Sequence, residues 1–231
     1  MKNMDRFDFC GFPRLVHLSV DDVGSSLRWL CQNKPENIWE MDFFGELLSL
    51  HHKYDAQFSL YCFYELGGSL CFNDIPPVYA EQFNACSDWL KFGFHAYDGQ
   101  PFLNSSRWKE AFDCFEASAT QLKMGKADIL RLHYWKASEK QLRYLHERGV
   151  TTLLYLYDDE RYTGNKFIDS GIVHRKTTVC FEKICDLNPC TLKIGDPVII
   201  AFTHEKMFEH ELEKIRVALK LYSGNGYEYF S

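Results

Sequence analysis

The chain alternates short apolar runs with longer segments in which apolar positions recur every three or four residues. Short runs rich in β-branched and aromatic residues predict strands, and the periodic segments predict amphipathic helices. The predicted strands cover residues 15–20, 57–64, 91–96, 128–134, 150–157, 197–202 and 227–230. The predicted helices cover residues 40–54, 76–89, 105–122, 138–148 and 210–222.

This alternation predicts the fold class. Strands that are separated by helices pack as a parallel sheet or barrel with the helices outside, so we expect an α/β protein. Residues 158–196 break the rhythm with β-branched runs, Gly164, Gly171 and Pro189, and we interpret them as a β-rich insertion. No repeat, low-complexity run or linker divides the 231 residues, so a single domain is expected over residues 1–231.

The composition of the chain limits the kinds of partner that the protein can be expected to bind. The net charge of −6 argues against nucleic acid, whose phosphates require a basic stripe. No stretch approaches the roughly 20 apolar residues that span a bilayer. The first residues lack the apolar core of a signal peptide, and the nine cysteines include no CxxC pair, so free thiols in a cytoplasmic protein are expected. An aromatic fraction of 16% suits a carbohydrate or another small-molecule substrate.

Polar side chains collect where the predicted strands end. Because the carboxyl ends of parallel strands meet at one edge of a sheet or barrel, these side chains are expected to converge. Carboxylates and imidazoles suit zinc and other divalent first-row metals, which lower the pKa of a water to about 7. The side chains in question are Asp21, Asp22, His95, Asp98, Arg131, His133 and His204.

The adjacent carboxylates of Asp21 and Asp22 are the sharpest of these signals. Successive side chains alternate along a strand, so the two carboxylates cannot point the same way. One of them can bind a metal while the other acts on a substrate or a water beside it. We therefore expect a divalent cation at this strand end, with zinc as the first candidate.

Four short segments carry a resemblance to a known family. They are residues 18–22 (LSVDD), 93–95 (GFH), 130–134 (LRLHY) and 200–204 (IAFTH). In this order they resemble the polysaccharide deacetylase superfamily, whose members have a strand ending in paired aspartates, a glycine–histidine segment, an arginine-containing strand and a late strand ending in histidine. The resemblance spans roughly residue 15 to the C-terminus. It implies a distorted (β/α) barrel of about seven strands, in line with the seven predicted above.

The resemblance implies a role for each matching residue. Asp21 matches the general base, Asp22 the metal-binding aspartate and His95 the first metal-binding histidine. Arg131 matches the arginine that orients the base, and His204 the histidine that protonates the leaving amine. The implied activity is a metal-dependent hydrolase that removes an N-acyl group, most simply N-acetyl, from a sugar or a related small amide.

The third metal ligand departs from the family pattern. A catalytic zinc normally has three protein ligands, and the family places a second histidine four residues after the first, where this chain has Gly99. Asp98 is our candidate for the third ligand, and His133 and His174 are the alternatives.

The same departure leaves alternatives for the function. A catalytically degenerate protein could keep the fold and bind a carbohydrate or another small ligand. A hydrolase acting on an amide outside carbohydrates is a further reading, since one fold hosts many substrates. An oxidoreductase is set aside, because the chain has neither a GxGxxG segment nor a phosphate-binding loop.

Overall fold

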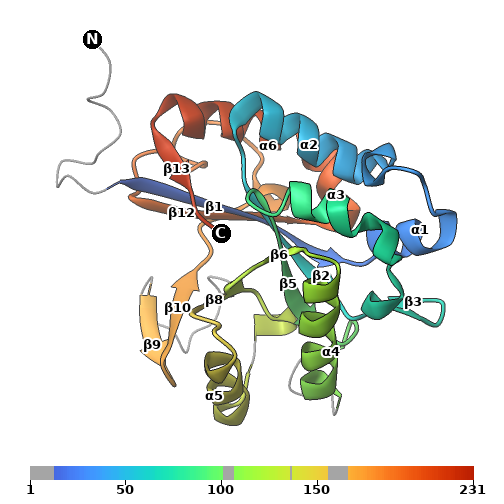
Figure 1. Ribbon diagram of the computed structural model, residues 1–231. Helices are drawn as coiled ribbons and strands as arrows, with labels where there is room; N and C mark the ends of the chain where they lie inside the picture. The colour runs from blue at the N-terminus through green and yellow to red at the C-terminus, as the bar shows by residue number, and fades with distance from the viewer. Residues whose placement is uncertain (1–12, 101–106, 136, 156–165) are drawn as a thin grey trace.

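The computed structural model describes residues 13–100, 107–135, 137–155 and 166–231, which form two main sheets with helices packed around them (Figure 1). The larger sheet has the strand order β11-β12-β1-β2-β5-β6, and β13 also pairs with β1. Its strands are β1 (Arg14–Val23), β2 (Phe58–Phe63), β5 (Leu90–Ala96), β6 (Gly125–Lys126), β11 (Val179–Cys180), β12 (Val198–His204) and β13 (Tyr227–Tyr229).

β1 lies in the centre of this larger sheet and pairs in parallel with β12, β2 and β13. Both faces of β1 are buried, with Val16, Leu18 and Val20 on one face and His17 and Ser19 on the other, as expected for a strand covered on both sides. The register places Asp21 opposite His204 of β12. Two of the predicted site residues therefore lie side by side at the carboxyl ends of neighbouring strands.

The strands of the smaller sheet lie between β6 and β11 in the sequence. This sheet has the order β7-β8-β10-β9, in which only β9 is antiparallel. No ladder joins β6 to β7 or β10 to β11 among the described residues, so these strands form two separate sheets and no closed hydrogen-bonded ring. The strands of the smaller sheet are β7 (Ile129–Leu130), β8 (Thr152–Tyr155), β9 (Lys166–Asp169) and β10 (Ile172–Lys176).

The α/β class predicted from the alternation is confirmed. The described part of the region 158–196 contributes strands to both sheets. Residues 158–165 lie outside the described residues. The remainder is rich in strands, as predicted, but these strands are members of the two sheets: β10 belongs to the smaller sheet and β11 to the larger. A short hairpin of β3 (Glu65–Gly67) and β4 (Leu70–Cys71) stands apart from both.

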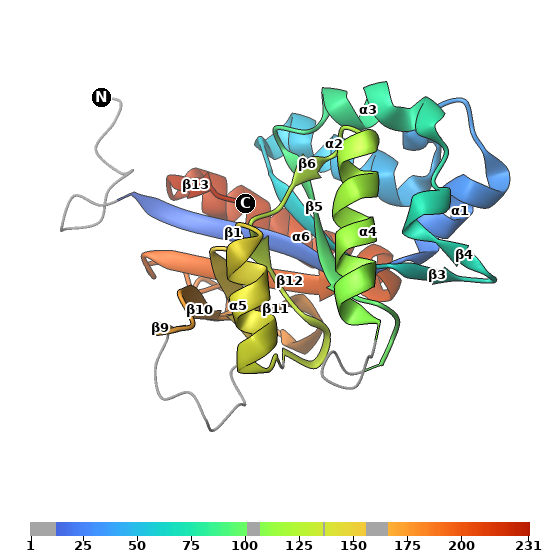
Figure 2. The same cartoon turned by 60° about the horizontal axis from the view of Figure 1, so that its bottom comes forward.

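The helices lie on both sides of the larger sheet. In the view of Figure 1, α2 and α6 lie above it and α4 and α5 below it, an arrangement that Figure 2 shows from a second side. The rings of Phe43 and Phe208 join α2 to α6, and those of Phe94 and Phe112 join β5 to α4. The helices are α1 (Ser25–Asn33), α2 (Asp42–Tyr54), α3 (Ala80–Ala85), α4 (Trp108–Gln121), α5 (Glu139–Glu147) and α6 (Glu205–Gly224).

Helix α1 is absent from the sequence-based prediction, and a distant residue caps it. Its N-cap residue, Gly24, has no side chain, and the Glu205 carboxylate accepts hydrogen bonds from the N–H groups of Gly24, Ser25 and Ser26 at 3.0, 2.8 and 2.6 Å. A carboxylate at a helix N-terminus also complements the helix dipole. The start of α1 is therefore stabilised by the first residue of α6.

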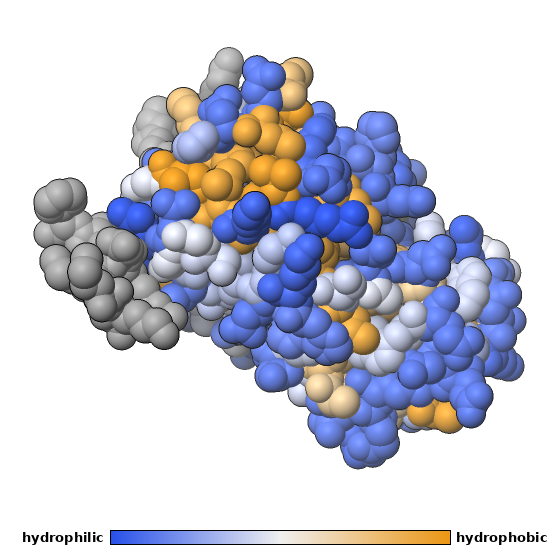
Figure 3. Space-filling model, turned by 90° about the horizontal axis from the view of Figure 1, so that it is seen from above, coloured by the Kyte–Doolittle hydropathy of each residue, from blue (hydrophilic) through white to orange (hydrophobic). Residues whose placement is uncertain are grey.

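The upper face of the molecule, as it is oriented in Figure 1, is mostly hydrophilic. Seen from above in Figure 3, the hydrophobic side chains on this face gather in one main area, bordered by hydrophilic ones. Among the described helices, none combines the length and the apolar character needed to cross a membrane.

His17 is a buried imidazole in β1. Its Nδ1 lies 3.0 Å from the carbonyl oxygen of Phe230, and its Nε2 lies 3.0 Å from the hydroxyl oxygen of Tyr61. Burial lowers the pKa of His17 from 6.5 to about 4, against a hydrogen bond to Phe230 that raises it. His17 is therefore neutral in the folded protein at neutral pH.

We expect the protein to lose stability as the pH falls from about 6.5 to about 4. In this range the unfolded chain binds a proton at His17 and the folded chain does not, so the free energy of unfolding falls by about 3 kcal/mol for this one group. Urea denaturation at pH 7 and pH 4 measures the loss. The variant His17→Gln should lose this part of the pH dependence, and the exposed-site control His210→Gln should keep it. An identical pH dependence in wild type and His17→Gln would contradict the assignment.

Candidate active site

Three side chains at the carboxyl edge of the strands bring their ligand atoms together. His95 Nε2 lies 3.2 Å and His133 Nδ1 lies 3.3 Å from the same Asp22 carboxylate oxygen, Oδ1. The two imidazole nitrogens are 3.2 Å from each other. Asp22 comes from β1, His95 from β5, and His133 from the turn after β7. The three atoms thus form a nearly equilateral triangle.

The opposite ring nitrogens decide which atoms of the two histidines carry protons. His95 Nδ1 lies 2.5 Å from the carbonyl oxygen of Arg131, and His133 Nε2 lies 3.1 Å from the carbonyl oxygen of Gly99. A carbonyl oxygen only accepts, so each of these nitrogens carries a proton. The nitrogens in the triangle are then the ones that can give a lone pair to a cation. Such an arrangement calls for a cation between them.

The triangle has the dimensions of a metal site. Ligand atoms about 2.1 Å from a tetrahedrally coordinated ion are about 3.4 Å apart, close to the observed 3.2 to 3.3 Å. Two imidazoles and a carboxylate suit zinc and other divalent first-row ions, and three protein ligands leave a coordination position open. These residues therefore fit a divalent cation, without selecting zinc among the first-row metals.

A bulge in β1 turns Asp22 toward the two histidines. The pairing of β1 with β2 shifts register between Val20 and Val23, and Asp22 has a left-handed backbone with φ of 59°. Aspartate is one of the few residues that tolerate this conformation. Burial alone would raise the pKa of Asp22, but the imidazoles of His133 and His95 outweigh it and hold the pKa well below its usual range. Asp22 is therefore ionised at neutral pH, as a metal ligand must be.

Asp21 points the other way, into a buried ion pair. Its Oδ2 lies 3.0 Å from Arg131 Nε, and the two side chains are 1% and 0% exposed. Arg131 also donates a hydrogen bond of 2.6 Å to the hydroxyl of Thr177 and stacks over the ring of Phe202. Burial raises the pKa of Asp21, although Arg131 opposes the shift. A carboxylate with a raised pKa, held in one orientation, suits a general base.

His204 carries a carboxylate partner that the sequence analysis did not identify. Its Nδ1 lies 2.7 Å from Glu182 Oε1, and its Nε2 lies 4.0 Å from Asp22 Oδ2. The hydrogen bond to Glu182 raises the pKa of His204, against burial, which lowers it. Glu182 follows β11 within the irregular region 158–196, where no motif marks it. Its carboxylate also accepts a hydrogen bond from the backbone N–H of His204 at 2.8 Å.

The structure brings most of the sequence-predicted site residues to one place. Asp98 lies outside the cluster of ligand atoms; its carboxylate accepts a hydrogen bond of 2.9 Å from the N–H of Gln100. His174 also lies outside the cluster, in β10, where it lines a small cavity with Leu132 and Tyr155. The third position of the triangle belongs to His133. The residues that converge are Asp21, Asp22, His95, Arg131, His133 and His204.

The strand predicted over residues 128–134 ends early, which places His133. Only Ile129–Leu130 pair as a strand, β7, and the chain turns at Tyr134, whose φ of 57° is left-handed. The turn directs His133 back over β5, where its ring contacts that of His95. The ring of Phe63 packs against both imidazoles and covers them from the side of β2.

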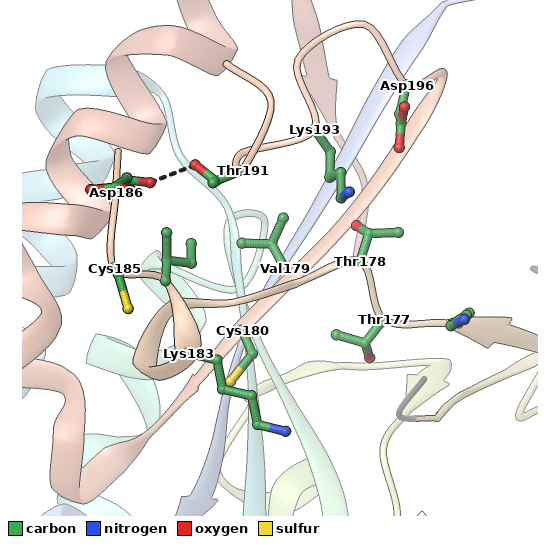
Figure 4. Close-up of a pocket in the computed structure, with 12 residues that line it drawn as sticks. Thr177, Thr178, Val179, Cys180, Lys183, Cys185, Asp186, Thr191, Lys193 and Asp196 are labelled. Atoms are coloured by element: carbon green, nitrogen blue, oxygen red, sulfur yellow. Dashed lines mark hydrogen bonds between the residues drawn. The ribbon is translucent and has the colours of Figure 1, made fainter. Parts of the chain in front are cut away.

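A cavity of about 640 Å³ lies apart from this cluster, beside β11, and none of the converging residues lines it. Figure 4 shows Lys193 and Asp196 toward one end of it and Lys183 toward the other. This cavity and the site chemistry therefore lie in different places, and the geometry of the ligand atoms decides in favour of the Asp22 cluster.

Comparison with known proteins defines the fold. No protein-family model and no curated protein sequence matches the chain. Solved structures do match: a peptidoglycan N-acetylglucosamine deacetylase is 11% identical with a TM-score of 0.57, over 94% of this chain and 86% of that one. A family 4 acetyl xylan esterase from Clostridium thermocellum, solved with a cobalt ion, is 11% identical with a TM-score of 0.55, over 94% and 87%.

A third similar structure sets a limit on what the fold implies. It is a pseudoenzyme of the same carbohydrate esterase family from Bacillus anthracis, 11% identical with a TM-score of 0.56, over 94% of this chain and 63% of that one. The chain thus has the fold of the polysaccharide deacetylases, which confirms the resemblance read from its sequence at the level of the fold. Because this fold also occurs in a pseudoenzyme, the function has to be argued from the site.

Proposed function

We propose that the chain is a metal-dependent hydrolase that removes an acyl group, most simply acetyl, from the nitrogen of a sugar or a related small amide. The observation that carries the proposal is the triangle of Asp22, His95 and His133, in which two imidazole nitrogens and a carboxylate oxygen lie 3.2 to 3.3 Å from one another. Asp21 and His204 flank it from neighbouring strands, as a base and an acid on two sides of one reacting group.

Asp22, His95 and His133 would hold the metal ion. When bound, a divalent cation lowers the pKa of a water to about 7 and polarises a carbonyl oxygen. Asp21 accepts the proton of the water that attacks the amide carbon. Arg131 holds the Asp21 carboxylate in place through its Nε, and burial keeps the proton affinity of that carboxylate high.

His204 completes the reaction on the side of the leaving group. Its pKa is raised by Glu182, which favours the protonated imidazole, the form that can donate to the departing nitrogen. Glu182 accepts from Nδ1 and leaves Nε2 directed toward the carboxylate of Asp22, where the substrate amide would bind. Glu182 is therefore a positioning residue for the acid.

A protein that binds sugars without turning them over is the second candidate. The pseudoenzyme among the similar structures shows that this fold does occur without catalysis. Gly99, at the position of the family's second metal histidine, favours this candidate, and the position of His133 argues against it, because His133 completes the three-ligand set from another segment.

Metal removal is expected to abolish acetate release, and its return to restore it. Protein dialysed against a chelator should release no acetate from N-acetylglucosamine or its oligomers, and zinc, cobalt, nickel or manganese should restore the activity when added singly. Circular dichroism before and after chelation controls for unfolding. Undiminished acetate release by the chelated protein would overturn the metal dependence. A metal-loaded protein that binds the sugars but releases no acetate would establish the second candidate instead.

A further inference from the structure

Asp22 lies where the hydrogen-bonded ladders around β1 are interrupted. The pairing of β1 with β12 ends at Asp21, and the pairing of β1 with β2 shifts register between Val20 and Val23. The backbone of Asp22 is left-handed, with φ of 59°, which is far from the conformation of a regular strand. The register of the sheet therefore does not by itself fix the position of the Asp22 carboxylate.

The carboxylate of Glu205 supplies a contact at this point from the neighbouring strand end. It accepts hydrogen bonds from three successive backbone N–H groups, those of residues 24–26, at 3.0, 2.8 and 2.6 Å. This segment begins two residues after Asp22, and Glu205 directly follows His204. The three hydrogen bonds therefore connect the end of β1, just past the metal ligand, to the end of β12, just past the acid.

Both carboxylate oxygens of Glu205 take part in this connection. Oε2 accepts from the N–H groups of Gly24 and Ser25, and Oε1 accepts from the N–H group of Ser26. Hydrogen bonds to a carboxylate are shorter and stronger than those between neutral groups, and the dipole of α1 favours a negative charge at this end of the helix. Contacts through two oxygens also fix the orientation of the carboxylate relative to the start of α1.

Capping a helix does not require a residue from another part of the chain. The N-cap residue usually supplies its own side-chain oxygen, as Ser138 does for α5. Helix α1 has Gly24 at this position and no side-chain cap of its own, so its acceptor comes from the residue beside His204. The position of Asp22 is thereby coupled to the position at which β12 ends and α6 begins.

We propose that Glu205 is a positioning residue, which holds the metal ligand Asp22 and the acid His204 at the separation that the reaction requires. The proposal rests on the proposed function and deepens it, because Glu205 acts through these two residues and not on the substrate itself. When this connection is weakened, the end of β1 shifts relative to β12, and the Asp22 carboxylate no longer meets the two imidazoles in the same geometry.

The variant Glu205→Gln tests the connection with little change in shape. A glutamine amide has one acceptor oxygen, and its NH₂ group would face a backbone N–H that needs an acceptor. We expect the variant to bind Co²⁺ about tenfold more weakly than the wild type, the lower end of what changes to the residues behind a metal ligand cost. The visible absorption spectrum of the bound Co²⁺ should change as well, because it depends on the geometry of the ligands.

Competition with a chelator measures the Co²⁺ affinity, and circular dichroism checks the fold. Glu40→Gln is the matched control, because the Glu40 carboxylate also accepts a hydrogen bond from a backbone N–H, that of Asn37 at 2.9 Å, but lies outside the cluster of ligand atoms. We expect this control to bind Co²⁺ like the wild type. A folded Glu205→Gln with the affinity and the spectrum of the wild type would overturn the proposal, and so would equal losses in the two variants.

Acetate release from N-acetylglucosamine oligomers at saturating metal separates this proposal from the proposed function. We expect Glu205→Gln to lower kcat about tenfold with little change in KM, because the substrate itself loses no contact. Altered Co²⁺ binding in the variant without acetate release by the wild type would keep the positioning of Asp22 and overturn the function. Acetate release with equal kcat and equal Co²⁺ binding in both proteins would keep the function and overturn the proposal. A wild type that binds no Co²⁺ would overturn both.

Discussion

Replacing Asp22 with asparagine is expected to abolish metal binding and to lower acetate release by on the order of 10³-fold or more, since the acidity that the ion confers on water is lost with it. Asp22 supplies the carboxylate of the triangle, and its Oδ1 is the atom that both imidazoles approach. Asparagine has nearly the same shape and also tolerates the left-handed backbone at this position. The variant should therefore fold normally.

Elemental analysis by mass spectrometry, beside the acetate assay, measures the effect of Asp22→Asn. Asp98→Ala is the matched control, because Asp98 is an aspartate near the same edge that lies outside the triangle. We expect near-stoichiometric metal in the wild type and in Asp98→Ala, and a trace in Asp22→Asn. Loss of metal in Asp98→Ala with retention in Asp22→Asn would contradict the ligand set and return Asp98 to it.

Replacing Arg131 with methionine is expected to lower the free energy of unfolding by about 3–5 kcal/mol, the usual cost of breaking a buried ion pair from one side. Arg131 is fully buried, and its removal leaves the Asp21 carboxylate without its cation in a site that is 1% exposed. The hydrogen bond to Thr177 and the contact with the Phe202 ring are lost as well. Urea denaturation at pH 7 measures the change.

A second substitution separates the cost of leaving the Asp21 carboxylate without its cation from the cost of the lost packing around Arg131. Asp21→Asn removes the charge, so the double variant Asp21→Asn/Arg131→Met should be more stable than Arg131→Met alone. If the two single costs simply add in the double variant, the ion pair is not what stabilises this part of the core. Both variants are expected to lack acetate release, since Asp21 is either removed or no longer oriented by Arg131.

Local signals in the sequence predicted most of the regular elements. Helix α5 was expected over residues 138–148 and spans Glu139–Glu147, because Ser138 caps it and accepts a hydrogen bond from Gln141 N. The strand expected over residues 197–202 is β12, which continues to His204. Helix α1 was not predicted, because its cap comes from Glu205 at the other end of the chain.

The sequence by itself determined the α/β class and five residues of the candidate site. Apolar periodicity specifies strands and helices locally, and the edge at which parallel strands end then follows from the alternation. Polar side chains at the ends of parallel strands therefore lie at one edge of the sheet. That reasoning, with the family resemblance, selected the residues that the structure brings together: Asp21, Asp22, His95, Arg131 and His204.

Only the tertiary structure decided the third ligand of the triangle and the partner of the acid. His133 reaches the triangle because the chain leaves β7 early and turns through a left-handed Tyr134, and Glu182 reaches His204 because β11 pairs with β12. Both contacts join segments far apart in the sequence. Neither produces a periodic pattern of apolar or polar residues from which it could be predicted. Their geometry depends on how the strands pack, which a pattern of single residues does not record.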